Sequence, residues 1–143
     1  TLLYKILKLL VYDWQPIFCF HCTRSYCLFT NTHAEQARDS SYFQGVLSMI
    51  RHLLAAGAST KEKTGVKSDS VLFFVCAYFK GDELVALVKL LCEFGIDVNA
   101  KTSKYGTTGK PCNAIEVLKL ENPSQISVLL KIEQIMKLHG FSE

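Results

Sequence analysis

The stretch LVKLLCEFGIDVNAKT, residues 87–102, changes its pattern at one glycine. In 87–94, leucine and valine recur at spacings of one, three and four, which predicts one apolar stripe along a helix. After Gly95 the residues alternate between apolar and polar, which is typical of an extended segment. We therefore expect a helix that stops at Gly95 and an exit segment that turns away from it.

The same pattern occurs earlier in the chain. GVLSMIRHLLAAGASTKEKT (45–64) aligns with ELVALVKLLCEFGIDVNAKT (83–102) at an offset of 38 residues, so that Gly57 matches Gly95. A glycine just past a helix end adopts a left-handed conformation without Cβ strain. The alignment therefore predicts the same helix, glycine stop and exit twice.

The offset also extends backwards and forwards. Thr32 matches Ser70, and Ser70 begins SVLFFVCA, a hydroxyl residue followed by an apolar run, as in a capped first helix. A weaker third copy has its first helix at 110–120 and its second at 125–140, and it ends at Gly140. Each copy reads as helix, turn, helix, glycine and extended exit.

These residues carry a family resemblance. LVKLLCEFGIDVNAK (87–101) matches the closing half of the ankyrin repeat, V-V-K-L-L-L-x-x-G-A-D-V-N-A, and SVLFFVCA (70–77) loosely matches its opening half, T-P-L-H-x-A. The chain thus resembles the ankyrin repeat family, most clearly over 70–101, with a second copy at 32–64 and a weak third at 108–140. The resemblance implies an all-α, ankyrin-like helical repeat solenoid with short hairpin fingers. Its expected segments are an N-terminal helical cap or degenerate repeat (1–31), two ankyrin-like repeats (32–69 and 70–107) and a degenerate C-terminal capping repeat (108–143).

The resemblance also implies where a partner binds. In this family the exit segments pair into finger-like hairpins, which makes KEKTGVK (61–67) and KTSKYGTTGK (101–110) equivalent fingers with one basic ridge. Part of each first helix lines the concave binding face in this family. The matching positions in this chain are Phe74 and Tyr78. The expected partner-binding residues are Lys61, Lys63, Lys67, Phe74, Tyr78, Lys101, Lys104, Tyr105 and Lys110.

Simpler interpretations of these residues stay open. Lysines on hairpin edges also keep those edges soluble. Phe74 equally fits packing against a neighbouring helix, because FFVCAYF is bulky throughout. The resemblance implies that the side chains of Leu72, Val75 and Cys76 face the core.

Function on a repeat scaffold depends on surfaces, because each repeat contacts only its neighbours. We expect a protein-interaction module, a regulatory or targeting region of a larger intracellular protein, whose partner is another protein with an acidic or mixed surface. It needs no cofactor and is not an enzyme in this interpretation. An alternative is the non-catalytic part of an enzyme or of a host-directed effector, as in secreted effectors of intracellular microbes and viral host-range proteins.

A cysteine-rich segment offers a second class of function. Cys19, His21, Cys22 and Cys27 suggest a small zinc-organised domain, since two thiolates three residues apart can share one tetrahedral zinc. A second paired set of ligands is missing, and aromatic flanks favour buried thiols.

Two enzymatic readings have less support from the sequence. In the first, Cys22 or Cys27 would be the nucleophile and His33 or His52 the general base. Nothing in their spacing along the sequence indicates that such a pair comes together. GTTGK (106–110) lacks the four-residue gap and the hydroxyl residue of a phosphate-binding loop.

Composition sets the outer limits. With 143 residues, 49% of them hydrophobic, the chain is long enough for one domain with a core. The net charge of +3 is too small to indicate nucleic-acid binding. Cysteines in apolar runs favour a reducing, cytoplasmic compartment.

The N-terminal third is the most apolar part of the chain. TLLYKILKLLVYDWQPIFCF (1–20) contains charges and a proline, so we expect no membrane-spanning helix. We instead expect a helix over the first dozen residues that packs on the stack, and an apolar, covered segment at 17–29. The helical stripe is predicted to consist of Leu2, Leu3, Ile6, Leu9 and Leu10.

Overall fold

The computed structural model describes residues 2–12, 40–60, 63–64, 69–103 and 109–142. Within these residues the secondary structure consists of six helices and one pair of two-residue strands. The helices are α1 (Leu2–Tyr12), α3 (Ser40–Ala55), α4 (Val71–Tyr78), α5 (Gly81–Glu93), α6 (Ala114–Glu121) and α7 (Ile126–Leu138), and the strands are β1 (Lys63–Thr64) and β2 (Asp69–Ser70). The predicted all-α class is confirmed.

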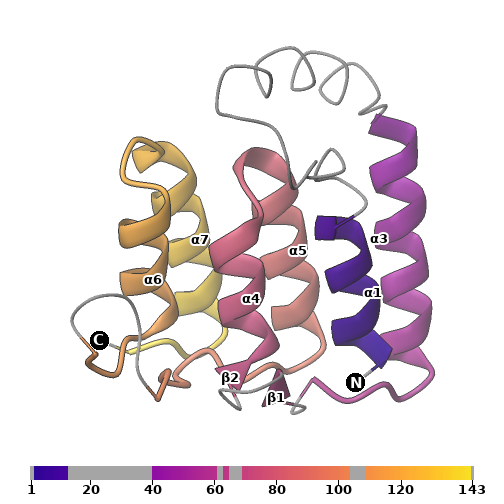
Figure 1. Cartoon of the computed structure of the whole chain (residues 1–143), viewed down its shortest axis with the longest axis horizontal. Coiled ribbons are helices and arrows are strands. Elements are labelled where there is room, and N and C mark those ends of the chain that lie inside the picture. The colour runs from indigo at the N-terminus through magenta and orange to yellow at the C-terminus, as the bar shows by residue number, and fades with distance from the viewer. Residues whose placement is uncertain (1, 13–39, 61–62, 65–68, 104–108, 143) are drawn as a thin grey trace, which may run out of the picture.

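The helices form two rows (Figure 1). In one row α4 packs between α1 and α6, and in the other α5 packs between α3 and α7. Contacts of α4 with α5 and of α6 with α7 join the rows. In Figure 1, α1, α4 and α6 begin at the lower edge of the molecule, and α3, α5 and α7 end there. Buried side chains of all six helices form one apolar core.

The three predicted glycine stops are confirmed. Gly57, Gly95 and Gly140 have φ values of 98°, 80° and 92°, in the left-handed region. Each glycine N–H donates to the carbonyl three residues back, and the next N–H donates to the carbonyl five residues back. These bonds are Gly57 to Leu54 (3.1 Å), Ala58 to Leu53 (3.0 Å), Gly95 to Cys92 (3.1 Å), Ile96 to Leu91 (3.2 Å), Gly140 to Lys137 (3.2 Å) and Phe141 to Met136 (3.0 Å). All three helices therefore end in the same Schellman motif.

The start of α4 also follows the prediction. Ser70 is its N-cap, and the Ser70 hydroxyl accepts a hydrogen bond from the Leu72 N–H at 3.3 Å. Leu72, Val75 and Cys76 are fully buried, as expected. Two more residues of this helix, Val71 and Phe73, are also buried, so α4 contacts neighbours on several sides.

The helix before Gly57 extends further upstream than the aligned stretch 45–64. The helix α3 begins at Ser40, five residues before Gly45, which lies inside it. The buried residues Val46, Ile50 and Leu54 recur every fourth position, and their packing offsets the cost of about 1 kcal/mol that a helical glycine brings. The start predicted at Thr32 lies outside the described residues.

The first helix of the third copy also begins later than predicted. It starts at Ala114, and the residues from Lys110 lead into it without helical structure. Pro111 disfavours a helical conformation of the residue before it. Asn113 then sets the start through a capping box with Glu116, its side chain accepting from the Glu116 N–H at 2.9 Å. Cys112 therefore precedes the helix.

The helix predicted at the N-terminus is present, but its buried stripe differs. Leu3 and Leu7 are each 1% exposed, whereas Leu2 is 56% exposed. Residues four apart share a helix face, and Leu2 lies about 100° around the helix from Leu3. The side chains of Leu9 and Leu10, and the apolar segment 17–29, lie outside the described part.

Candidate interaction surface

The first predicted finger, 61–67, overlaps a short pair of strands. The strands β1 and β2 pair antiparallel, with Lys63 opposite Ser70 and Thr64 opposite Asp69. The chain therefore reverses between β1 and α4, at the lower edge of Figure 1. Lys61, Lys67 and the side chain of Lys63 lie outside the described part of the structure.

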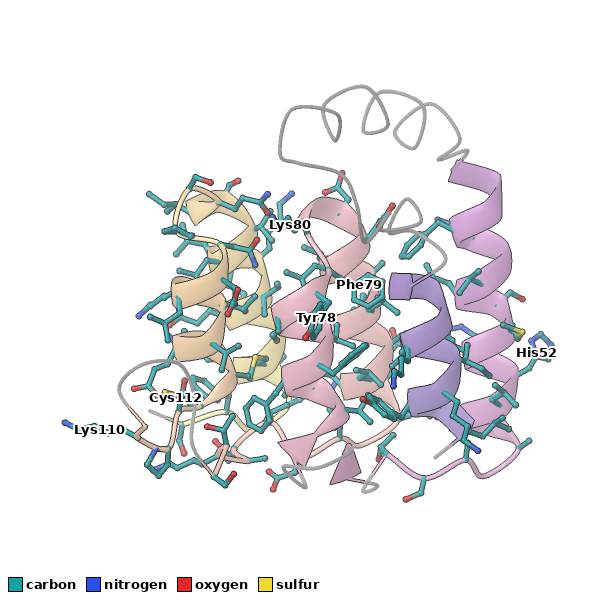
Figure 2. The ribbon with its side chains drawn as sticks, viewed as in Figure 1. His52, Tyr78, Phe79, Lys80, Lys110 and Cys112 are labelled. Atoms are coloured by element: carbon teal, nitrogen blue, oxygen red, sulfur yellow. The ribbon has the colours of Figure 1, made fainter. Side chains whose placement is uncertain are left out.

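The second predicted finger is closed at its base by two residues. The Thr102 N–H donates to the Cys112 carbonyl at 2.9 Å, and the Cys112 N–H donates to the Thr102 hydroxyl oxygen at 3.0 Å. Thr102 is only 2% exposed, so its hydroxyl is a buried structural acceptor. Cys112 lies at the same edge of the molecule as the strands β1 and β2 (Figures 1 and 2).

Two lysines of the predicted ridge can be located on this second finger. Lys101 and Lys110 are exposed, and Lys110 points away from the helices in Figure 2. Lys104 and Tyr105 lie outside the described residues. A single ridge of six lysines therefore stays a prediction.

The two predicted aromatic residues of α4 are in contact with each other. The ring centroids of Phe74 and Tyr78 are 4.8 Å apart. Tyr78 is 57% exposed and points outward from α4 (Figure 2). Phe74 is half-buried beneath it.

A third ring, from α1, completes this cluster. Tyr4 meets Phe74 edge to face, with centroids 5.2 Å apart and planes at 81°. Phe74 therefore packs against a neighbouring helix, and it also supports the exposed ring of Tyr78. Such edge-to-face pairs are worth about 1 kcal/mol beyond their buried area, so the contact of Tyr4 with Phe74 helps to hold α1 against α4.

A positive charge lies beside the rings. The Lys8 ammonium is 6.0 Å from the centroid of the Tyr4 ring, one helical turn further along α1. We call the set Tyr4, Lys8, Phe74 and Tyr78 the front face. Sequence reasoning missed Tyr4 and Lys8, although their spacing of four matches that of Phe74 and Tyr78.

Candidate metal and nucleophile residues give no second site in the described part of the chain. The zinc set Cys19, His21, Cys22 and Cys27 lies outside the described residues, as does His33. Among the residues that are described, no group of three or more histidine, cysteine or acidic side chains is placed to hold a metal ion. His52 is exposed on α3, with its Nδ1 2.7 Å from the Ser48 carbonyl oxygen.

Two of the buried cysteines, Cys76 and Cys92, have raised pKa values. Burial raises the pKa of Cys76 far above its ordinary value, and the nearby Cys92 adds to the effect. Burial, with a smaller contribution from the charge of Glu93, raises the pKa of Cys92 to about 11. Since the thiolate is the nucleophile, the raised pKa values argue against a nucleophilic role for these two cysteines.

Comparison with protein-family models, curated proteins and solved structures gives no match for this chain. In the described segments, no helix combines the length and the apolar character needed to cross a bilayer.

Proposed function

We propose that the chain is a protein-interaction module, built as a short ankyrin-like stack, that holds a partner on its front face. The three helices of one row, α3, α5 and α7, all end in the same Schellman motif, at Gly57, Gly95 and Gly140. This repetition supports a stack of similar units. The contacts of α4 with α6 and of α5 with α7 also support it, since each helix pair packs on the next. No ordered catalytic set enters this proposal.

The third helix pair, α6 and α7, has polar residues where a terminal capping repeat would be expected to have them. Val88 and Cys92 lie seven and three residues before Gly95, and both are buried in α5. At the same distances before Gly140, α7 has Glu133 and Lys137, which form an ion pair at 2.8 Å. A polar outer face suits a terminal repeat, which has no neighbour on that side.

The exposed aromatic ring of Tyr78 is the observation that carries the proposed binding function. It is more than half exposed, yet its support by Phe74 and Tyr4 limits the side-chain freedom that binding would remove. Tyrosines of this kind are enriched among the residues that dominate interface affinity. The front face thus offers a rigid anchor for another protein.

The lysine fingers supply the second part of the proposed surface. Lys101 and Lys110 are exposed. Lys110 lies at the edge where the helices α4 and α6 begin (Figures 1 and 2). Charges at an interface rim mainly raise the association rate and make it depend on salt. We expect them to steer a partner with acidic groups, and the front face to retain it.

A capture experiment tests the anchor. The immobilised chain is incubated with cell extract, and each retained protein is quantified by mass spectrometry for wild type, Tyr78→Ala and Leu138→Ala. Leu138 is 84% exposed near the end of α7 and serves as a control for loss of an exposed side chain. The proposal requires a protein that wild type and Leu138→Ala retain and Tyr78→Ala loses; equal retention by all three rejects the anchor.

A second measurement tests the fingers separately. Association rates of the captured protein are compared for wild type and the Lys101→Glu, Lys110→Glu double variant across a salt series. We expect the variant to associate about tenfold more slowly at low salt, with the gap closing as salt rises. An unchanged rate and salt slope would remove the fingers from the interface.

A further inference from the structure

The described helices do not pack on one another with equal closeness. The helix α5 packs much more extensively on α7 than on α3, and α4 packs much more extensively on α6 than on α1. Within the same group of four helices, α4 also contacts α5 and α6 contacts α7. The helices α4, α5, α6 and α7 therefore form the most closely packed part of the described structure.

Hydrogen bonds tie the last helix pair to the middle one at both edges of the molecule. At the upper edge of Figure 1, where α5 begins, the Gly81 N–H donates to Gln125 Oε1 at 3.1 Å. At the opposite edge, the Asn99 side chain bonds to the backbone of Gly140 at 2.9 Å and of Ser142 at 3.0 Å. These bonds join residues more than 40 positions apart in the sequence, so α6 and α7 cannot leave α4 and α5 without breaking them.

The boundary with α1 and α3 is crossed by weaker interactions. Arg51 Nη1 of α3 lies 3.1 Å from Glu93 Oε2 of α5, but the two side chains are 57% and 35% exposed. Ion pairs at such exposed sites contribute little to stability. The helix α1 meets α4 through the edge-to-face contact of Tyr4 with Phe74. Apolar side chains supply the remaining attachment, and those that are buried are Leu3, Leu7, Val46, Ile50 and Leu54.

A stack of helix pairs can open at one end, because each pair is stabilised by its own packing and by its neighbours alone. The end with the smaller interface opens first, and such partial openings need less free energy than complete unfolding. In the described part of this chain, that end consists of α1 and α3.

We propose that α1 and α3 detach from the stack while α4, α5, α6 and α7 stay folded, and that the front face is complete only while α1 is docked. Detachment separates the Tyr4 ring from Phe74, so docking of α1 acts as a switch for this surface. A partner that contacts both α1 and α4 binds the docked form and shifts the population towards it. The opening itself goes beyond the proposed function, and only this link to a partner rests on it.

Hydrogen exchange of the full chain tests the opening. Amide exchange is followed by NMR under native conditions and at several low urea concentrations, which resolves the opening of each helix. In wild type, the amides of α1 and α3 should exchange at least about tenfold faster than the slowest amides of α5 and α7. Their exchange should also depend less on urea, because partial opening exposes less surface than complete unfolding.

Two matched substitutions locate the boundary. Ile50 in α3 and Ile132 in α7 are both fully buried, and replacing either with valine removes one methyl group and should shift an opening equilibrium about fivefold. Because α7 stays folded in the open form, Ile132→Val should speed exchange in α5 and α7 and leave α1 and α3 unchanged. Ile50→Val should speed exchange in all four helices, since complete unfolding also loses the packing of Ile50.

A second pair of variants tests the switch. Tyr4→Ala removes the ring that joins α1 to α4 and should speed exchange in α1 by about fivefold or more. Tyr78→Ala removes a ring that contacts Phe74 within the same helix, so it is the control and should leave exchange in α1 unchanged.

Three results would overturn the inference. The first is equal exchange of α1, α3, α5 and α7 in wild type with one urea dependence, which shows a single cooperative unit. The second is an Ile132→Val protein in which α1 and α3 are accelerated as much as α5 and α7. The third is a Tyr4→Ala protein whose α1 exchanges as in wild type. None of these results bears on Tyr78 as an anchor, which the capture experiment tests separately.

Discussion

The side chain of Asn99 is hydrogen-bonded to the backbone of Gly140, 41 residues away in the sequence. The Asn99 Nδ2 donates to the Gly140 carbonyl at 2.9 Å, and the Asn99 Oδ1 accepts from the Ser142 N–H at 3.0 Å. The exit segment after α5 thereby holds the exit segment after α7. The Asn99 N–H also donates to the Asp97 carboxylate at 3.0 Å, which fixes the turn that presents this side chain.

Replacing Asn99 should loosen the last helix pair. Asn99→Ala removes both side-chain bonds at an exposed site, so we expect a loss of about 1 kcal/mol in the free energy of unfolding. Urea denaturation measures it. Asn99→Asp keeps the acceptor and loses the donor, and its stability should lie between the other two; equal stability of Asn99→Ala and wild type would show that the bonds contribute nothing.

Two glycines should respond to alanine in opposite directions. Gly95→Ala forces a residue with a Cβ into a φ of 80° and should destabilise the protein by about 1–2 kcal/mol. Gly45→Ala, within α3 and with open space around the added Cβ, should stabilise it by up to about 1 kcal/mol. Thermal unfolding of both variants checks this, and a stabilised Gly95→Ala would contradict the helix stop.

The base of the second finger depends on one hydroxyl. Thr102→Val leaves the buried N–H of Cys112 without the acceptor at 3.0 Å, which should cost about 1–3 kcal/mol. Thr102→Ser keeps the acceptor and should lose less. Denaturant unfolding of the two variants separates the hydrogen bond from the packing of the threonine methyl group, and a Thr102→Val protein as stable as Thr102→Ser would be inconsistent with a role for this bond.

The matched positions in α5 and α7 should tolerate charge very differently. Val88→Glu buries an unpaired carboxylate in the core and should destabilise the protein by more than about 3 kcal/mol. Glu133→Val removes only a partly exposed ion pair, so stability should change by less than about 1 kcal/mol. It also extends an apolar surface, and light scattering should detect more self-association. Similar losses in both variants would argue against α7 as the capping helix.

Alkaline pH should weaken the fold through the buried thiols. Burial raises the pKa of Cys92 from an ordinary value of about 9 to about 11. Between these values the unfolded chain releases the proton more readily, so the stability that the protonated thiol provides below pH 9 is lost as pH rises to about 11. Cys92→Ala should be less stable at neutral pH and show a shallower decline over this interval. Parallel stability curves for the variant and wild type would rule out this contribution.

The helix ends at the three glycines could be predicted from the sequence, because the residues that signal them are close together in the chain. A helix stripe followed by glycine and an alternating exit is complete within about a dozen residues, and Gly57, Gly95 and Gly140 all have the expected conformation. Ser70 as an N-cap is equally local.

Helix starts and buried faces were less accessible, because they depend on distant packing. The stripe of α1 was assigned partly to Leu2, which only the arrangement of the neighbouring helices excludes from the core. The front face shows the same limit. Phe74 and Tyr78 followed from the resemblance, but Tyr4 joins them from more than 60 residues away in the sequence, through a ring contact that no local pattern encodes.

Chemical-shift mapping tests the front face most directly. A protein captured by the wild-type chain is titrated into the isotopically labelled chain, and the backbone amide shifts of the labelled chain are followed. The account predicts that the largest changes cluster at Tyr4, Lys8, Phe74 and Tyr78, with small changes along α5 and α7. Largest changes on the outer surfaces of α5 or α7, with the amides of the front face unmoved, would contradict it.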